Sequence, residues 1–383
     1  MRPPPVEGDD PSAADPRAAA SVPALVGALR DEIAAAPDRR ITFARFMERA
    51  LTAPDLGSYA TSALRPTRAG DFLTAPELHP FFGRCIGRQL TEVWERLGRP
   101  APFRVREWGA GRGTLAGGVV DGLAIDGSGL ADALLWDPID VPGRHPAPPA
   151  GRFTGAVLAN EYLDALPVHR VEGRRGGVLL ERYVTWADGW FAEEAGEPST
   201  PALAAELAAD GITLGDGQVA EIRPGLADWV AEATAELDRG LLLVIDYGHP
   251  ASELYAPRRF AGTLMTYRDH VAGDDPFAAV GRADLTAHVN LSALARGAHA
   301  AGLDDLGTTS QAEMLVGLGL GDLLGRMGLD PATDGDAYLL ARAAVLRLLD
   351  PRHLGGFRVV ALGRGIERIP VLSGLAFRSG RPG

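Results

Sequence analysis

The sequence predicts an α/β fold: a doubly wound, Rossmann-like sheet with added helical segments on its N-terminal and C-terminal sides. The prediction rests on three strand-like runs, residues 103–107, 155–159 and 241–245, and on the helical spacing of apolar residues between them. Each run ends in glycine or polar residues, and ligands bind at this end of the strands in open α/β sheets. Strands that alternate with helices pair in parallel, because a parallel pair needs a long crossover connection.

The stretch 103–115, FRVREWGAGRGTL, is the most informative part of the chain. Its glycines stand at alternate positions, Gly109, Gly111 and Gly113, where a strand turns into a helix that begins near Thr114. Glycine adopts positive φ and lets a ligand approach bare backbone N–H groups, which a helix N-terminus also presents. A dinucleotide fingerprint would have its third glycine at Thr114, so NAD is disfavoured. The spacing favours another nucleotide-like ligand, and an ordinary glycine-rich turn is the alternative.

Size and composition are those of a globular enzyme. With 383 residues, 46% of them hydrophobic, the chain can fill the core of one large domain or of two domains. It has no apolar run of membrane-spanning length and no basic-then-apolar leader, so we expect a cytoplasmic protein without membrane partners. Cys85 is the only cysteine, which excludes an internal disulfide and a multi-cysteine metal site, and we expect no metal.

The charged residues exclude several functions. The sequence contains no lysine, so P-loop, Schiff-base and protein-kinase chemistry are all excluded. A formal net charge of −12 disfavours nucleic-acid partners, because phosphate contacts need clustered basic groups. A basic protein partner would fit this charge, and acidity that serves only solubility is the alternative.

A second strand is predicted at residues 133–136, and Asp137 follows it. An acid at this distance from the glycines is placed to bind a ribose diol. The proline-rich link 138–151 is too short for a helix, a third strand and another helix. Either the third strand is missing, or the position of the second strand is wrong.

Two acids and an amide follow the strand at 155–159. Asn160 and Glu161 come directly after it, and Asp164 stands three residues further along. Carboxylates at this end of a strand can orient a nitrogen nucleophile or take its proton. His169, in the same stretch, is a candidate third member. The alternative is that Asn160 caps the turn and Asp164 is solvated.

Two other stretches supply candidate substrate contacts. Tyr247 and His249 follow the apolar run 241–245, and Asp71 precedes a helix that Thr74 caps. The loop that carries Asp71 could fold over the pocket as a lid, and a plain capped helix is the alternative. We assign Asp71, Tyr247 and His249 to the substrate.

The predicted organisation combines a core with added segments. Strand, helix and composition patterns divide the chain as follows: a disordered tail at 1–22; an N-terminal helical cap or lid at 23–100; a Rossmann-like core at 101–309 with a hairpin insertion at about 170–225; a helical insertion at 310–355; and the closing strand with a tail at 356–383.

From about residue 41 to residue 365 the chain resembles the MidA-type S-adenosylmethionine (SAM)-dependent methyltransferases, and the resemblance rests on six ordered motifs. This family includes the mitochondrial arginine methyltransferase required for respiratory complex I assembly. The motifs are GDFLTAPEL at 70–78, EWGAGRGTL at 107–115, ANEYLDALPVHR at 159–170, IDYGH at 245–249, GTLMTYRDH at 262–270 and ADLTAHVN at 283–290.

The resemblance implies a class I methyltransferase sheet, SAM as the cofactor, and, from the mitochondrial members, symmetric dimethylation of an arginine. It places Glu107 near the methionine ammonium. We assign cofactor contacts to Glu107, Gly109, Gly111, Gly113, Asp137 and Asn160. We assign catalysis to Glu161, Asp164 and His169, because paired carboxylates suit a guanidinium.

Two other functions stay open. The chain could methylate an oxygen or nitrogen of a small molecule, with the Tyr- and Trp-bearing hairpin at 178–192 forming the acceptor pocket. It could also be a non-catalytic assembly factor that binds SAM only as a structural ligand. The expected partner is therefore a protein substrate or a small-molecule acceptor.

Overall fold

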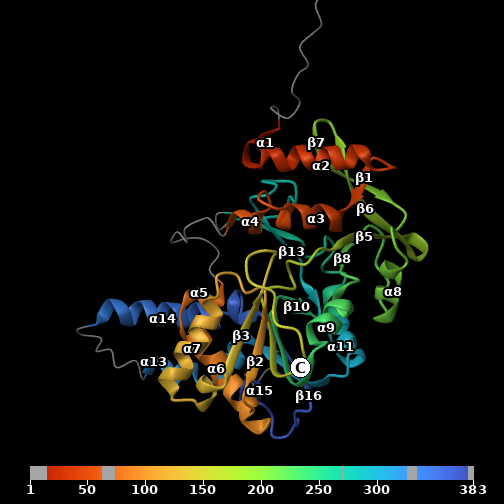
Figure 1. The fold of residues 1–383 in the computed structure, drawn as a ribbon. Helices are drawn as coiled ribbons and strands as arrows, with labels where there is room; N and C mark the ends of the chain where they lie inside the picture. The colour runs from red at the N-terminus through yellow and green to blue at the C-terminus, as the bar shows by residue number, and fades with distance from the viewer. Residues whose placement is uncertain (1–14, 63–73, 269–270, 326–333, 378–383) are drawn as a thin grey trace, which may run out of the picture. The chain divides into compact units, whose positions relative to one another are not determined.

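The computed structural model describes residues 15–62, 74–268, 271–325 and 334–377 (Figure 1). The chain forms two compact units, each assembled from separate stretches of sequence. The first unit takes residues 1–71, 165–223 and 255–287, and the second takes 72–164, 224–254 and 288–383. Each unit has its own hydrophobic core.

The second unit contains a six-stranded sheet in the order β15-β16-β9-β4-β2-β3. Four neighbouring strands run parallel, whereas β16 is antiparallel to both of its neighbours. The predicted α/β sheet is thus confirmed. Its strands are β2 (Phe103–Trp108), β3 (Leu134–Ile139), β4 (Phe153–Asn160), β9 (Leu237–Asp246), β15 (Asp304–Ser310) and β16 (Arg358–Arg364).

Helices cover both faces of this sheet. Leu241 and Leu243 of β9 belong to one hydrophobic cluster with α6 (Phe81–Arg96) and α7 (Thr114–Asp126). Leu242, between them, is fully buried on the opposite face, where α9 (Leu226–Thr234) packs against α11 (Leu291–Ala300). Figure 1 shows the two helix pairs on either side of the strands. Burial on both faces explains the nearly continuous apolar run of β9.

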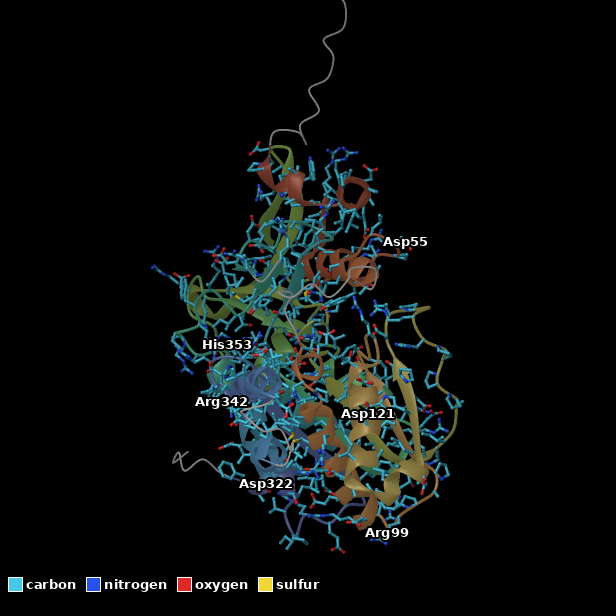
Figure 2. All side chains as sticks on the ribbon, turned by 90° about the vertical axis from the view of Figure 1, so that its left-hand side faces the viewer. Asp55, Arg99, Asp121, Asp322, Arg342 and His353 are labelled. Atoms are coloured by element: carbon cyan, nitrogen blue, oxygen red, sulfur yellow. The ribbon has the colours of Figure 1, made fainter. Side chains whose placement is uncertain are left out.

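The other α-helices and strands in the described part of the second unit are short, apart from α14. They are α5 (Ala75–Leu78), β10 (Gly248–His249), α10 (Ala251–Leu254), β14 (Val289–Asn290), α12 (Gln311–Gly317), α13 (Leu320–Gly325), α14 (Gly335–Leu349) and α15 (Ser373–Ala376). Charged residues such as Asp121 of α7, Asp322 of α13 and Arg342 of α14 are exposed on the outer sides of their helices (Figure 2).

The third strand is missing, which settles one of the alternatives that the sequence left open. Residues 140–152 are all described and contain neither helix nor strand, so β3 is an edge strand that pairs only with β2. The second strand is also longer than predicted, because it continues through Pro138 to Ile139. An edge strand tolerates proline, since its outer side lacks a hydrogen-bonding partner.

The first unit is built on an antiparallel sheet in the order β1-β6-β5-β8, with β7 paired to β6. The predicted hairpin joins β6 to β7 through Asp188 and Gly189, whose φ angles of 51° and 81° are those of a two-residue hairpin turn. The strands of this sheet are β1 (Arg40–Thr42), β5 (His169–Arg174), β6 (Val178–Ala187), β7 (Trp190–Gly196) and β8 (Val219–Ile222).

In the described residues of the first unit, a smaller sheet and five α-helices accompany this sheet. Aromatic rings of Phe46, Phe191 and Phe277 meet in its core at centroid distances of 5.2–6.0 Å. The sheet has the strands β11 (Met265–Arg268), β12 (Val271–Gly273) and β13 (Asp284–Thr286). The helices are α1 (Pro16–Ala20), α2 (Pro23–Ala35), α3 (Phe43–Thr52), α4 (Ser58–Ser62) and α8 (Ala202–Ala209).

Two boundaries differ from those predicted. The stretch taken as a disordered tail includes helix α1, whose first turn is capped by Asp15. The helices expected to form one N-terminal cap are divided between the units, because α6 packs tightly on α7: a Cβ on Gly83 would lie 2.5 Å from the carbonyl carbon of Gly118. Helical spacing shows which face is buried but not what buries it.

No helix in the described ranges is long and apolar enough to cross a membrane.

Candidate functional site

The candidate site lies where β2, β3, β4 and β9 end. Because these strands are parallel, their carboxyl ends meet at one edge of the sheet. The glycine loop follows β2, Asp140 follows β3, Glu161 follows β4, and Tyr247 follows β9. The sequence-based expectation that these stretches share one edge is confirmed.

The glycine loop has the predicted conformation. Gly109, Gly111 and Gly113 have φ angles of 74°, 54° and 77°, in the left-handed region that favours glycine. Gly109 is also a point of close approach, since a Cβ there would lie 2.8 Å from Cδ2 of Tyr162. The ring of Tyr162 therefore covers this part of the loop.

The expectation that this loop presents bare amides to a ligand is wrong for its first three residues. The N–H groups of Gly109 and Ala110 both donate to the carbonyl of Ile139, at 2.9 and 3.1 Å. The N–H of Gly111 donates to Oδ2 of Asp140 at 2.5 Å. The glycines thus let the loop fold against the end of β3, and this contact fixes its shape.

Glu107 is the penultimate residue of β2, just before the glycine loop, and its side chain is buried, with 4% of the residue surface exposed. Burial raises its pKa from 4.5 to about 7; the neighbouring charge of Asp140 also raises the pKa, and a hydrogen bond from Nε1 of Trp136 lowers it. The Trp136 indole donates to Oε2 of Glu107 at 2.9 Å. Glu107 is therefore held by Trp136 just before the glycine loop and can gain or lose a proton near neutral pH.

The structure does not support Asp137 as the acid at the end of the second strand. Asp137 lies within β3, where Oδ2 is 2.7 Å from Nη1 of Arg104 and 3.7 Å from Nε of Arg106. Its carboxylate therefore balances the charge of two arginines of β2. The predicted strand end at Trp136 is wrong, because β3 continues to Ile139, whereas the ribose contact assigned to Asp137 stays a prediction.

Asp140 is the acid that follows β3, and the sequence analysis missed it. Its carboxylate accepts hydrogen bonds from the N–H of Gly111 and Val141 and from Nη1 of Arg144, at 2.5, 2.6 and 3.0 Å. The signal was present in the sequence, since the second acid of WDPID stands three residues after the first.

Glu161 and its neighbours form the centre of the site. Oε1 of Glu161 accepts hydrogen bonds from the N–H of Ala75 at 3.0 Å and from Nδ2 of Asn160 at 3.2 Å. Burial raises the pKa of Glu161 to about 8; the hydrogen bonds from Ala75 and Asn160 lower the pKa, and the charges of Asp164 and Glu77 raise it. The charge of Asp164 therefore acts on Glu161, and the catalytic roles assigned to these two acids stay predictions.

His169 is assigned to a different unit from Glu161 and Asp164. It begins β5, and its Nδ1 is 2.7 Å from Oε1 of Glu181 on β6, a residue with no exposed surface. The histidine satisfies a buried carboxylate in its own sheet. The structure thus gives His169 a partner in its own sheet, and the catalytic role assigned to it stays a prediction.

Tyr247 and His249 lie in a stack of rings at the end of β9. The ring of His288 is 5.6 Å from that of Tyr247 and 5.3 Å from that of His249, with interplanar angles of 9° and 30°. Nδ1 of His249 is 3.3 Å from Oε2 of Glu253. The sequence analysis quoted His288 in a motif but gave it no role. Asp71, the third predicted substrate contact, lies outside the described residues.

We expect the two raised pKa values to make stability depend on pH. The folded protein keeps protons on Glu107 and Glu161 up to about pH 7 and 8, whereas in the unfolded chain both groups lose them near pH 4.5. The folded state therefore binds more protons in this window, and its free energy of unfolding falls as pH rises.

Urea unfolding between pH 5 and 9 measures this dependence. Glu161→Gln should show a shallower slope and, above pH 8, exceed the wild type by at least about 1.4 kcal/mol, the equivalent of one pKa unit. Glu95→Gln, in an exposed pair with Arg99, is the matched control and should follow the wild-type curve. An unchanged slope in Glu161→Gln would show that this carboxyl titrates normally.

Comparisons with known proteins agree with the geometry of the site. The family model described as "Putative S-adenosyl-L-methionine-dependent methyltransferase" matches residues 85–135 and 130–309. The chain is 35% identical, with a TM-score of 0.81, to a crystal structure of a Burkholderia thailandensis protein bound to S-adenosyl-homocysteine (SAH), and the match covers 98% of this chain and 99% of that one.

More distant relatives are mitochondrial. The Drosophila melanogaster "Protein arginine methyltransferase NDUFAF7 homolog, mitochondrial" is 29% identical over 65% of this chain, a match that spans 64% of the fly protein. The Homo sapiens "Protein arginine methyltransferase NDUFAF7, mitochondrial" is 25% identical over 82% of this chain and 78% of its own length.

The residues at the sheet edge fit SAM. Oδ1 of Asn160 is buried and accepts no hydrogen bond from the described part of the chain, which suits a ligand that brings a donor. The buried carboxyl of Glu107 suits a cationic group, and the loop at 109–113 has the shape expected of a nucleotide-binding turn. SAM is the cofactor, and the chain belongs to this family of S-adenosyl-L-methionine-dependent methyltransferases.

Proposed function

We propose that this methyltransferase modifies an arginine nitrogen of a protein and produces symmetric dimethylarginine. The observation that carries the proposal is the placing of Glu161 and Asp164 together after β4, where Glu161 is held by Ala75 and Asn160. Paired carboxylates are the groups that bind a guanidinium best. The names of the relatives at 25% and 29% identity support the same acceptor.

The proposed chemistry assigns two tasks to the chain. SAM supplies an activated methyl group on a positively charged sulfur, so the protein has to align the acceptor and accept a proton. Asp164 would hold the guanidinium charge. Glu161, whose pKa is raised to about 8, would lose its proton when the positively charged guanidinium binds beside it, and the resulting carboxylate would then accept the acceptor's proton.

In this proposal Glu107 and Asn160 hold the amino acid part of SAM, and Asp140 takes the ribose contact first assigned to Asp137. Asp140→Asn should weaken SAH binding at least ten-fold by calorimetry, which corresponds to about 1.4 kcal/mol. Asp137→Asn should leave SAH affinity unchanged and lower thermal stability, because it removes the partner of Arg104. If SAH binding is weaker in Asp137→Asn and unchanged in Asp140→Asn, the ribose contact belongs to Asp137 and the proposal for Asp140 is wrong.

Labelling of a lysate tests the acceptor. The purified protein and radioactive SAM are added to a lysate from a strain that lacks the protein, and the products are separated by size and hydrolysed. Label in a protein band that yields symmetric dimethylarginine supports the proposal. Label that yields another methylated residue would contradict it. SAH binding without any transfer would favour the non-catalytic assembly factor.

One observation favours a small-molecule acceptor instead. The first unit contains a cavity of about 450 Å³, large enough for a small ligand, between α1, α2 and the hairpin residues Trp186 and Trp190. The hairpin predicted to form an acceptor pocket therefore does line a cavity. Label recovered only in the low-mass fraction of the lysate would support this second function.

A further inference from the structure

We propose that Asp246 is the positioning residue of this site. It holds the turn 162–164, which includes Asp164, and through this turn it also holds the preceding Glu161 in the arrangement that methyl transfer requires. The inference rests on the proposed function, because it assigns Glu161 and Asp164 to the reaction. Asp246 is the last residue of β9 and lies in the motif IDYGH at 245–249, where the sequence analysis gave it no role.

One oxygen of Asp246 binds three consecutive backbone amides. Its Oδ2 accepts hydrogen bonds from the N–H groups of Tyr162, Leu163 and Asp164, at 3.2, 2.8 and 3.2 Å. These residues are more than 80 positions away in the sequence. The turn after β4 is therefore fastened to the end of the neighbouring strand.

The other oxygen and the burial of Asp246 are consistent with a charged group in this role. Oδ1 accepts a hydrogen bond from the N–H of Tyr247 at 2.8 Å. Only 1% of the residue surface is exposed, so water cannot compensate a charge there. Four backbone donors can do so, because a carboxylate with several N–H partners keeps its charge when it is buried.

The conformation of Glu161 shows why this attachment matters for the site. Its φ is 52°, in the left-handed region, which is unfavourable for a residue with a side chain. Its own N–H donates to the carbonyl of Ile245 at 2.9 Å, and the next three amides bind Asp246. The end of β9 thus holds the backbone amide of Glu161 and the amides of the three residues that follow it. These contacts keep the Glu161 side chain directed at Ala75.

Asparagine is the informative replacement because it has the same size but only one acceptor oxygen. If that oxygen faced the three amides, the NH₂ group would meet the N–H of Tyr247, and the reverse orientation would place NH₂ against the three amides. In either case two donors face each other, which is unfavourable for buried polar groups. Asp246→Asn should therefore loosen one of the two attachments without opening a cavity.

The experiment compares the full-length wild type with Asp246→Asn and with Asp238→Asn. Asp238 lies on the same strand, is half exposed and pairs with Arg152, so it controls for the loss of a carboxylate from β9. Three quantities are measured: amide hydrogen exchange by mass spectrometry, SAH affinity by calorimetry, and the initial rate of lysate labelling as a function of SAM concentration.

For Asp246→Asn we expect exchange of the peptide that covers 162–164 to become at least ten-fold faster and the maximal labelling rate to fall at least ten-fold. The KM for SAM and the Kd for SAH should stay within about three-fold of the wild type, because the contacts that we assign to SAM at Glu107 and Asp140 remain. A merely structural role would move the rate, KM and Kd together. Asp238→Asn should match the wild type in all three quantities.

Several results would overturn the inference. If the amides at 162–164 exchange freely in the wild type, the inference is refuted. This result needs no variant, so it can be obtained even if Asp246→Asn does not fold. An unchanged labelling rate in Asp246→Asn would also refute it, as would a parallel loss of SAH affinity. Failure of the wild type to label any acceptor would refute the proposed function, whereas the exchange data would still judge the attachment of the turn to Asp246.

Discussion

Glu161→Gln is expected to lower the rate of methyl transfer by at least about a hundred-fold, the usual contribution of a group that takes a proton in the reaction. Glutamine keeps the size of the side chain and can still accept the hydrogen bond from Ala75, so the turn after β4 should keep its shape. Glutamine stays neutral at every pH, so it cannot become the carboxylate that would bind a guanidinium by charge and accept its proton. SAH affinity, measured by calorimetry, should remain within about three-fold of the wild type, since the cofactor contacts are assigned to other residues.

The control for this prediction is an acid outside the site. Glu95→Gln removes a carboxylate of α6 that pairs with Arg99 at the surface, and we expect it to leave the rate of lysate labelling unchanged. Transfer at the wild-type rate by Glu161→Gln would remove Glu161 from the mechanism. A loss of SAH binding in the same variant would make it a cofactor contact instead.

Gly109→Ala is expected to abolish SAH binding and to destabilise the protein. The new Cβ would lie 2.8 Å from Cδ2 of Tyr162, and the φ of 74° is unfavourable for alanine. Strain of this kind costs about 1–3 kcal/mol before the clash with the ring is added. Either the loop or Tyr162 has to move, and both border the site. Thermal unfolding and calorimetry with SAH measure the two effects.

Gly117→Ala is the matched control for the glycine loop. Gly117 lies in α7, a Cβ there would meet no atom within 4 Å, and its φ is not positive. Alanine is a better helix former than glycine by about 1 kcal/mol, so this variant should be as stable as the wild type or more stable, with unchanged SAH affinity. Equal effects of the two substitutions would contradict the special role of the backbone at Gly109.

Local conformation could be predicted from the sequence to a large extent. Glycine at 109, 111 and 113 predicted left-handed backbone, and the structure has it at all three positions. Continuous apolar runs predicted the buried strands β4 and β9, and Asp188-Gly189 predicted the hairpin turn. These features depend on the steric limits of one or two residues, or on the period of burial along one element, which the sequence contains.

The roles of individual acids could not be predicted in this way. Whether the second strand ends before Asp137 or before Asp140 depends on whether the strand can contain Pro138. It can do so only because β3 lies at the edge of the sheet, where one side of the strand needs no hydrogen-bonding partner. His169 follows Asn160, Glu161 and Asp164 closely in the sequence, yet its partner is Glu181 on the next strand. For each of these residues, the role depends on which strand neighbours its own strand in the sheet.

The sequence by itself thus determined the fold class, the family, the glycine loop and the two carboxyl groups after β4. Only the tertiary structure decided that the loop amides bind the end of β3 and that Asp246 holds the turn beyond Glu161. The physical reason is that backbone conformation is limited by local sterics, whereas the partner of a buried polar group is chosen among atoms that only folding brings within hydrogen-bonding distance.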